Sequence, residues 1–599
     1  MALRKLFFAL AAPLVLAQAA AAHESGWTAW SADAFARAKA EKRLLILDLE
    51  AVWCHWCHVM ARKTYGDGRV AALIAEKFVA MRADQDASPE LASRYGDWGW
   101  PATIIFAPDG TELAKFRGYV EPERMAAILQ TFIDDPTPGP SAFSVPAVTP
   151  ASDARIPADL RAEQESAFAE NFDSVHAGWG VGHKYIDGDS LDYAIARAES
   201  GDAKAESQAR KTLAAARALI DPVWGGVNQY SDAEDWSSPH FEKLATFQAQ
   251  YLRQYAQAYA RWRDPADLKA AEAIKAYLLN FLHDPQGGFY VSQDADLDEK
   301  TDGHTYYALG DSGRRKLGLP RIDTSIYARE NGMAISALTG LYAATGDETA
   351  LEAARAAAQW VKARLAVEAG GFQHGEKGAG VFLSDNLAMS QAFVDLYAAT
   401  GDRLWLKDAL AAGRFIAAHF RQESGGFFPA RTSEAPVGAL AKPLVQIDDQ
   451  IAVARLMTLL NRYSGEKFFA DQAEHALRYA VAAAQDMARP LPGLLLAERE
   501  MLHAPTHITI LGPKGDVDAQ KLAAAARAFP AANKRLDWWD RAEGPLDNPD
   551  ISYPEMDQPA AFACGDRICS LPVFTPEDLK TAVERMARLA REPKGTATR

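Results

Sequence analysis

Residues 44–58 read Leu-Leu-Ile-Leu-Asp-Leu-Glu-Ala-Val-Trp-Cys-His-Trp-Cys-His, and this stretch decides the fold of the N-terminal part of the chain. The apolar run 44–49 predicts a short buried strand, and the apolar residues after the second cysteine have helical spacing. A Cys-x-x-Cys between a strand and a helix is a dithiol placed for redox chemistry. Cys54 would lie at the helix N-terminus, where exposed N–H groups stabilise a thiolate. Cys57, one turn later, would be close enough to attack a mixed disulfide formed at Cys54.

The residues around this dithiol resemble those of thioredoxin. Asp48 stands at the position of its buried acid, and residues 99–106, followed by 108–112, are similar to its cis-proline strand and hairpin. The resemblance implies a cis peptide bond before Pro101, although most X-Pro bonds are trans. The Trp100 backbone would then pair with an extended substrate.

The expected roles follow from this arrangement. Cys54 would be the nucleophile and Cys57 the resolving thiol, and the two would form a disulfide when oxidised. Asp48, with its pKa raised by burial, would accept the proton of Cys57, and His55 would tune Cys54 electrostatically. The side chains expected beside the substrate are those of Trp53, Trp56, Trp100 and Pro101.

Three other uses of the same cysteines remain as alternatives. A buried pair of structural cysteines does not explain the strand, the acid and the Gly-Trp-Pro context. The Cys-x-x-Cys-His pattern is also that of c-type haem attachment, but the flanking residues indicate a thioredoxin fold. Zinc would need a tetrahedron that four ligands within residues 54–58 cannot readily close. We therefore predict dithiol chemistry, with no metal and no cofactor.

Composition narrows the classes of partner. The 599 residues contain 64 Lys and Arg against 79 Asp and Glu, a net charge of −15. An acidic chain of this kind is not expected to bind nucleic acid or an anionic membrane as its main partner. The first 22 residues predict a signal peptide, with a basic start, an apolar core and small residues at 20–22. We expect a soluble exported protein, periplasmic in a Gram-negative host, without a later membrane span.

Composition shifts divide the mature chain into four parts. Residues 23–135 fit one thioredoxin-like domain, and the proline-rich residues 136–158 a semi-rigid linker. From 159 to 504, long Ala- and Leu-rich helices alternate with glycine pairs, and Leu341–Asp347 recurs as Leu396–Asp402. Such repeats suit stacked helical hairpins, in a solenoid or a closed toroid. Residues 505–599 predict a small α/β segment containing Cys564 and Cys569.

Taken over nearly its whole length, the chain resembles the family that includes spermatogenesis-associated protein twenty and the bacterial YyaL proteins. The resemblance rests on residues 54–60, 236–243, 287–296 and 562–572. It implies a multidomain fold, with an (α/α)6 toroid like those of six-hairpin glycosidases and sugar epimerases behind the thioredoxin-like domain. The family pattern changes at residues 227–230, 330–333, 384–387 and 447–450, positions expected at the toroid mouth.

A second group of candidate residues lies near the glycine-rich turns of the toroid. Paired carboxylates and a histidine suit acid–base work on a sugar. The alternative is that these residues cap helices and hold loop backbone. The candidates for binding substrate here are His240, Glu242, Asp294 and Asp385.

The predicted function is an exported thiol–disulfide oxidoreductase fused to a toroid that binds a partner or ligand. Its partners would be a protein thiol or disulfide and, in the toroid, a carbohydrate. Cys564 and Cys569 would form a structural disulfide, or alternatively a relay to the first pair. The alternative function is a carbohydrate-binding or carbohydrate-converting toroid with an accessory thioredoxin domain.

Overall fold

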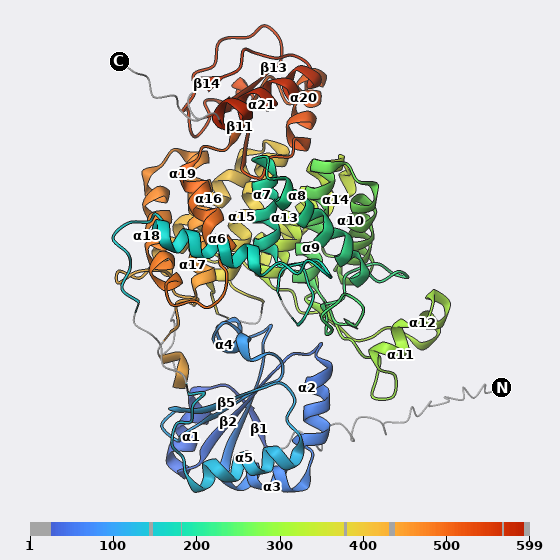
Figure 1. Cartoon of the computed structure of the whole chain (residues 1–599), viewed down its shortest axis with the longest axis vertical. Coiled ribbons are helices and arrows are strands. Elements are labelled where there is room, and N and C mark those ends of the chain that lie inside the picture. The colour runs from blue at the N-terminus through green and yellow to red at the C-terminus, as the bar shows by residue number, and fades with distance from the viewer. Residues whose placement is uncertain are drawn as a thin grey trace, which may run out of the picture. The chain divides into compact units, whose positions relative to one another are not determined.

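The computed structural model of the chain describes residues 26–142, 148–180, 182–376, 380–430, 438–441, 443–565 and 568–591 (Figure 1). The predicted signal peptide, residues 1–22, therefore lies outside the described residues. The chain forms two compact units. Unit 1 contains residues 1–144 and 435–442, and unit 2 contains residues 145–434 and 443–599.

Unit 1 is built on one five-stranded sheet with the order β1-β3-β2-β4-β5. β1 and β2 run parallel to β3, whereas β4 is antiparallel to both β2 and β5. The strand predicted at 44–49 is the central one, and it is buried along nearly its whole length. The strands are β1 (Trp27–Ala29), β2 (Leu44–Glu50), β3 (Phe78–Asp84), β4 (Ala102–Phe106) and β5 (Glu112–Arg117).

Helices cover both faces of this sheet, because side chains alternate between the faces along β2. Leu45 and Leu47 pack with Phe35 and Tyr95, and Ile46 packs on the other face with Met125. The first face is covered by α1 (Ala32–Glu41) and α4 (Pro89–Tyr95), and the second by α3 (Gly68–Lys77) and α5 (Pro122–Asp134). The dithiol helix α2 (His55–Val59) continues into a π-helical turn, η1 (Met60–Thr64). This is the thioredoxin-like arrangement expected from the sequence.

A short segment from far along the chain completes unit 1. Residues 435–442 group with it, although the sequence places them inside the helical repeats. Ala439 and Leu440 join the apolar cluster that contains Phe35. The backbone of Gly438 approaches the Phe35 ring so closely that a Cβ there would lie 2.5 Å from it. Burial of these apolar groups is the physical reason why this segment packs in unit 1, and no local sequence pattern predicts it.

Unit 2 contains a closed ring of helical hairpins, and six inner helices of the described chain contact each other in a cycle. The inner helices are α7 (Gly188–Glu199), α9 (Ala245–Trp262), α13 (Ala328–Thr345), α15 (Leu383–Thr400), α17 (Ile447–Ser464) and α19 (Pro492–Leu502). The outer helices are α6 (Ala158–Glu170), α8 (Ala203–Ala216), α10 (Pro265–Tyr277), α14 (Glu348–Arg364), α16 (Arg403–His419) and α18 (Lys467–Ala484). The toroid closes where α19 packs on α7.

The repeated sequence Leu341–Asp347 is explained by helix capping. Gly346 and Gly401 end inner helices in the left-handed conformation, at φ values of 78° and 69°. Asp347 and Asp402 follow and accept backbone N–H groups at the start of the next outer helices. Glycine avoids the Cβ strain of that conformation and aspartate satisfies N–H groups, so the motif marks these two inner-to-outer corners.

The glycine pairs are held by buried amide side chains. In four inner helices the fourth residue is Asn or Gln. Its side-chain amide oxygen accepts the backbone N–H of the residue that follows the glycine pair, and its amide nitrogen donates to the C=O of the same residue. The pairs are Gln248–Val227, Asn331–Phe289, Asn386–Phe372 and Gln450–Phe427. These contacts join each turn to the N-terminal end of an inner helix and satisfy buried backbone groups there.

Residues after 505 form a four-stranded sheet with the order β12-β11-β13-β14, covered by two helices (Figure 1). β12 was not predicted from the sequence, because Arg535 and Asp537 interrupt its apolar pattern. Both are buried and paired with each other. The elements are β11 (Thr506–Leu511), β12 (Lys534–Trp539), β13 (Ala560–Gly565), β14 (Ile568–Cys569), α20 (Val517–Ala528) and α21 (Pro576–Arg591).

This tail is part of unit 2 and bonds to the toroid. The Tyr397 hydroxyl on α15 donates to Asp537 at 2.8 Å, and the Tyr463 hydroxyl on α17 accepts from the backbone N–H of Leu536 at 3.2 Å. No helix in the described part of the chain is long and apolar enough to cross a membrane. The remaining elements of unit 2 are short: α11 (Gly303–Tyr307), α12 (Asp311–Leu317), β6 (Tyr230–Ser231), β7 (Pro239–His240), β8 (Lys243–Leu244), β9 (Ser292–Gln293) and β10 (Ile322–Asp323).

Candidate active site

Cys54 and Cys57 form a disulfide at the start of α2. Cys54 is the N-cap residue, and its Sγ accepts the backbone N–H of Cys57 at 3.1 Å. Their exposed fractions are 4% and 2%, so both sulfurs lie almost completely inside the protein. The N-cap position places the Cys54 sulfur at the end of the helix where N–H groups point outward, which favours a negative charge on it.

The aromatic and histidine side chains around the pair differ in what they offer. Trp53 is buried, and its Nε1 donates to Asp86 at 2.7 Å, so it holds the loop and presents no surface to a substrate. Trp56 is 42% exposed and packs edge-on against His55, with ring centroids 5.3 Å apart. His58 Nε2 lies 3.1 Å from the Val52 carbonyl oxygen. Of the two predicted tryptophans in the motif, Trp56 alone is exposed.

Asp48 is a buried carboxyl in the central strand, with an exposed fraction of 2%. Burial raises its pKa from 3.8 to about 6, against the opposing effect of Arg82, whose Nε lies 3.3 Å from Oδ2. The desolvation of a charged carboxylate outweighs the attraction of one guanidinium that is itself partly exposed. A carboxyl of this kind exchanges a proton near neutral pH, as a proton acceptor in thiol chemistry must.

The peptide bond between Trp100 and Pro101 is cis, as the resemblance to thioredoxin implies. It immediately precedes β4, which pairs antiparallel with β2. Pro101 is buried, whereas Trp100 is partly exposed and packs at the edge of an apolar cluster.

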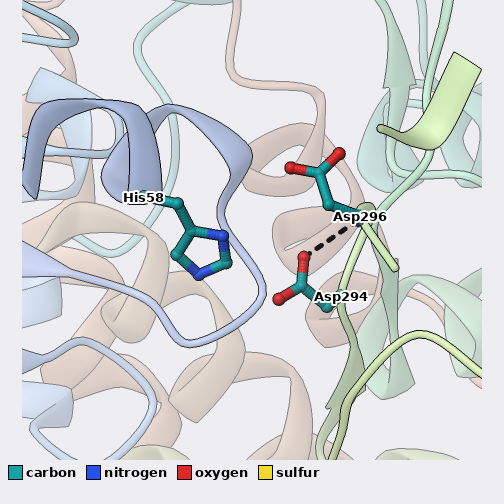
Figure 2. Close-up of side chains that lie close together, drawn as sticks. All are labelled: His58, Asp294 and Asp296. Carbon is teal, nitrogen blue, oxygen red and sulfur yellow. Dashed lines mark hydrogen bonds between the residues drawn. The ribbon is translucent and has the colours of Figure 1, made fainter. Parts of the chain in front are cut away.

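In unit 2, three of the four predicted acid–base residues come together around the short sheet β8–β9. His240 stacks on the Tyr230 ring at 4.3 Å, and its Nδ1 lies 3.8 Å from Glu242 Oε2. Burial, together with the nearby charges of Asp296 and Glu242, raises the pKa of Asp294 from 3.8 to about 7. Figure 2 shows the Asp294 carboxylate accepting the backbone N–H of Asp296, at 3.0 Å. This arrangement holds one carboxyl that is half-protonated near pH 7 beside another that is buried.

The fourth residue, Asp385, has a different setting at the N-terminal end of α15. It is fully buried, and its two oxygens lie 3.0 and 3.1 Å from His374 Nδ1. It also accepts the backbone N–H of Arg329 at 2.9 Å. His374 in turn stacks on the Tyr327 ring at 4.1 Å. Asp385 therefore orients a buried histidine.

The sequence analysis did not identify His374 as a partner, nor the acids at the same helix position in the neighbouring repeats. Glu330 on α13 and Asp449 on α17 are, like Asp385, the third residues of inner helices. Burial and the charge of Asp448 raise the pKa of Asp449 to about 7. Aligning the helix starts rather than the glycine pairs would have revealed this set.

A cavity of about 700 Å³ runs along the axis of the toroid and ends at residues 527–536 of the tail. Thr339 and Thr458 face it, and within the described chain their buried hydroxyls have no hydrogen-bond partner. Burial raises the pKa of Asp395, which also lines the cavity, to about 6. Buried polar atoms of this kind are normally satisfied by water or by a bound molecule, so the toroid has room for a small polar ligand.

Comparison with known proteins agrees with this architecture. Residues 11–133 match the family model Thioredox_DsbH, described as "Protein of unknown function, DUF255". Human spermatogenesis-associated protein 20 is 21% identical over 703 residues, covering 92% of this chain and 89% of the human protein. An uncharacterized protein of Caenorhabditis elegans is 22% identical, covering 92% of this chain and 94% of its own length. The resemblance predicted from the motifs is confirmed.

Solved structures similar to unit 2 include cellobiose 2-epimerase of Bacillus thermoamylovorans. That structure has a TM-score of 0.42 and 11% sequence identity, and the match covers 53% of this chain and 85% of the epimerase.

Proposed function

We propose that this protein is a thiol–disulfide oxidoreductase whose reactive pair is Cys54 and Cys57, and the match of residues 11–133 to the DUF255 family model supports this. The observation that carries the proposal is the position of Cys54 at the N-cap of α2, with Cys57 bonded to its sulfur. A structural disulfide needs neither a helix N-terminus at one sulfur nor a buried carboxyl that titrates near neutral pH in the adjoining strand.

The reaction has two exchange steps. The Cys54 thiolate attacks one sulfur of a substrate disulfide, forms a mixed disulfide and releases the other sulfur as a thiolate. The Cys57 thiolate then attacks Cys54, so the substrate leaves as a dithiol and Cys54–Cys57 becomes a disulfide. Asp48 would accept the proton that Cys57 loses, because its pKa of about 6 lies close to neutral pH. Oxidation of a substrate dithiol is the same sequence in reverse.

We place this activity outside the cytoplasm. The support is the basic and apolar character of residues 1–22, followed by small residues. Fusing residues 1–40 to alkaline phosphatase lacking its own signal, in a Gram-negative host, tests this directly. Phosphatase activity that survives with Arg4 and Lys5 replaced by Glu and with residues 6–16 deleted would contradict export.

The first experiment on the function is the reduction potential of the Cys54–Cys57 pair. The purified protein is equilibrated in glutathione or dithiothreitol buffers, and all four cysteines are followed by alkylation and mass spectrometry. A potential above about −200 mV indicates an oxidant or isomerase, and one near about −270 mV or below a reductase. The double variant Cys564→Ser/Cys569→Ser is the matched control, since it keeps the first pair alone. A pair that never reacts across the range refutes the proposal.

The second candidate function is that the toroid binds or converts a carbohydrate. The observation that favours it is the Asp294 carboxyl, half-protonated near pH 7, beside the buried Glu242 and His240. One protonated and one charged carboxyl are what acid–base work on a glycosidic or sugar hydroxyl group requires. A panel of mono- and disaccharides tested by calorimetry checks it. Binding retained in Cys54→Ser but lost in Asp294→Ala/Glu242→Ala would establish the toroid as a separate site.

A further inference from the structure

The second disulfide of the chain lies at the edge of the tail sheet. β14 is the outermost strand of the order β12-β11-β13-β14, and Cys569 on it pairs across the antiparallel ladder with Cys564 on β13. The two cysteines are bonded to each other. An edge strand presents backbone groups that another chain can reach, so this disulfide is placed where an incoming protein can approach it.

The two sulfurs of this disulfide are not equally accessible. Cys564 is 5% exposed and belongs to a buried cluster with Tyr553 and Phe562. Cys569 is partly exposed and packs only against the edge of that cluster. A thiolate attacks a disulfide at the sulfur it can reach and expels the other one. An incoming thiolate therefore attacks Cys569, and Cys564 leaves as the thiolate.

Three apolar side chains close to Cys569 in sequence are exposed, and together they are called the apolar collar here. Ile568 is 60% exposed, Leu571 is 84% exposed and Phe574 is 40% exposed. Hydrogen bonds from Ser570 N to the Ala563 carbonyl, and between the backbones of residues 561 and 573, hold this stretch along the sheet edge. A disulfide that only ties a hairpin needs no exposed apolar collar. Such collars mark contact surfaces for other proteins.

The other side of the proposed contact carries a matching feature. Trp56 lies between Cys54 and Cys57 in sequence and is 42% exposed, while both sulfurs beside it are nearly buried. An apolar side chain next to each reactive pair allows the two surfaces to exclude water around the exchanging sulfurs. An exposed apolar side chain near each pair favours, as the occupant, the dithiol domain of a second copy of this chain.

We propose that Cys564–Cys569 is a second redox pair that exchanges with the Cys54–Cys57 dithiol of a second copy of this chain. This inference rests on the proposed oxidoreductase function. The Cys54 thiolate attacks Cys569 Sγ, the S–S bond to Cys564 breaks, and Cys564 leaves as a thiolate that takes up a proton. The Cys57 thiolate then attacks Cys54 Sγ and releases Cys569. Two electrons and two protons pass from the first pair to the second, and no other oxidant or reductant is consumed.

The test traps the intermediate in the full mature chain. Cys57→Ser cannot resolve a mixed disulfide, so Cys54 should become linked to Cys569 while Cys564 becomes alkylatable. Peptide mapping without reductant identifies the bond. A linked dimer shows exchange between copies and supports the proposal, whereas a linked monomer would overturn the second copy as the partner. A bond from Cys54 to Cys564 instead would overturn the assigned point of entry.

The matched control is Cys57→Ser carrying Ile568→Asp and Leu571→Asp. These two side chains are exposed, so the substitutions should leave the fold intact while charging the apolar collar. We expect the Cys54–Cys569 bond to form at least tenfold more slowly, with an unchanged rate of Cys54 reaction with oxidised glutathione. If Cys54 reacts with glutathione disulfide but never with Cys569, the relay is wrong and the oxidoreductase stands. If Cys54 reacts with neither, both proposals are wrong.

Discussion

The buried carboxyl of Asp48 leads to a quantitative prediction about unit 1. The pKa of Asp48 is 3.8 in the unfolded chain and about 6 in the folded one. A folded state that holds the proton more tightly than the unfolded state loses stability as the pH rises between these two values. Well below pH 3.8 the carboxyl is protonated in both states and costs nothing. Above pH 7 the difference corresponds to about 3 kcal/mol of stability lost from the folded state.

The substitution Asp48→Asn removes this cost while keeping the side chain the same size. Arg82 keeps a carboxylate partner, because its Nε also lies 3.4 Å from Glu50 Oε2. We therefore expect the variant to be more stable than the parent by up to about 3 kcal/mol at pH 8, and about equally stable at pH 4. The gain should appear progressively as the pH passes from 4 to 7.

Hydrogen exchange followed by mass spectrometry in a urea series measures this on the whole oxidised protein. Peptides from β2 and β4 report unfolding of unit 1 separately from that of unit 2. The exposed carboxylate of Asp97, replaced by Asn, is the matched control and should change stability little at any pH. An Asp48→Asn variant that is equally or less stable at pH 8, with no change in that difference down to pH 4, would refute the assignment of a raised pKa.

Three further predictions concern unit 2. Asn386→Ala leaves the buried backbone N–H and C=O of Phe372 without partners. We expect the free energy of unfolding to fall by about 2–4 kcal/mol, which a lower urea midpoint would show. An unchanged midpoint would mean that the turn does not depend on this amide. Tyr397→Phe removes a hydrogen bond to Asp537, so hydrogen exchange in β12 should become faster at neutral pH. The pKa of Asp537 is lowered by Arg535. That stabilisation is present above the unfolded pKa of the carboxyl and is lost as the pH falls, so an effect of equal size at pH 2 would contradict it. Asp294→Asn should stabilise unit 2 more at pH 8.5 than at pH 4. The parent protein loses stability as the pH rises from 3.8 through about 7, because the folded state holds the Asp294 proton more tightly than the unfolded state. If the stability of parent and variant changes in parallel with pH, this prediction is wrong.

Much of the fold was predictable because it depends on local patterns. The apolar run 44–49 predicted a short buried strand, and the structure buries it with helices on both faces. The repeated sequence Leu341–Asp347 and the glycine pairs predicted stacked helical hairpins, and the structure shows that its glycine and aspartate cap helices through local backbone geometry. β12 was missed because its buried charges, Arg535 and Asp537, satisfy each other only after folding.

The candidate sites were predictable to different extents. The cysteine spacing predicts the dithiol, because residues one helical turn apart bring their two sulfurs close together. In contrast, Trp53 was expected beside the substrate, and the structure buries it against Asp86. His374 carried no signal of its own, since its partner Asp385 lies on the following inner helix.

The sequence by itself determined which segments are helix, strand and turn in most of the chain, and that one Cys-x-x-Cys pair begins a helix. These features depend on contacts within a few residues, which spacing and residue type reveal. Only the tertiary structure decided which side chains are exposed and which carboxyls hold a proton near neutral pH. Desolvation of Asp48 and Asp294, and the bare apolar collar around Cys569, arise from packing between segments distant in the chain, and no local pattern contains that information.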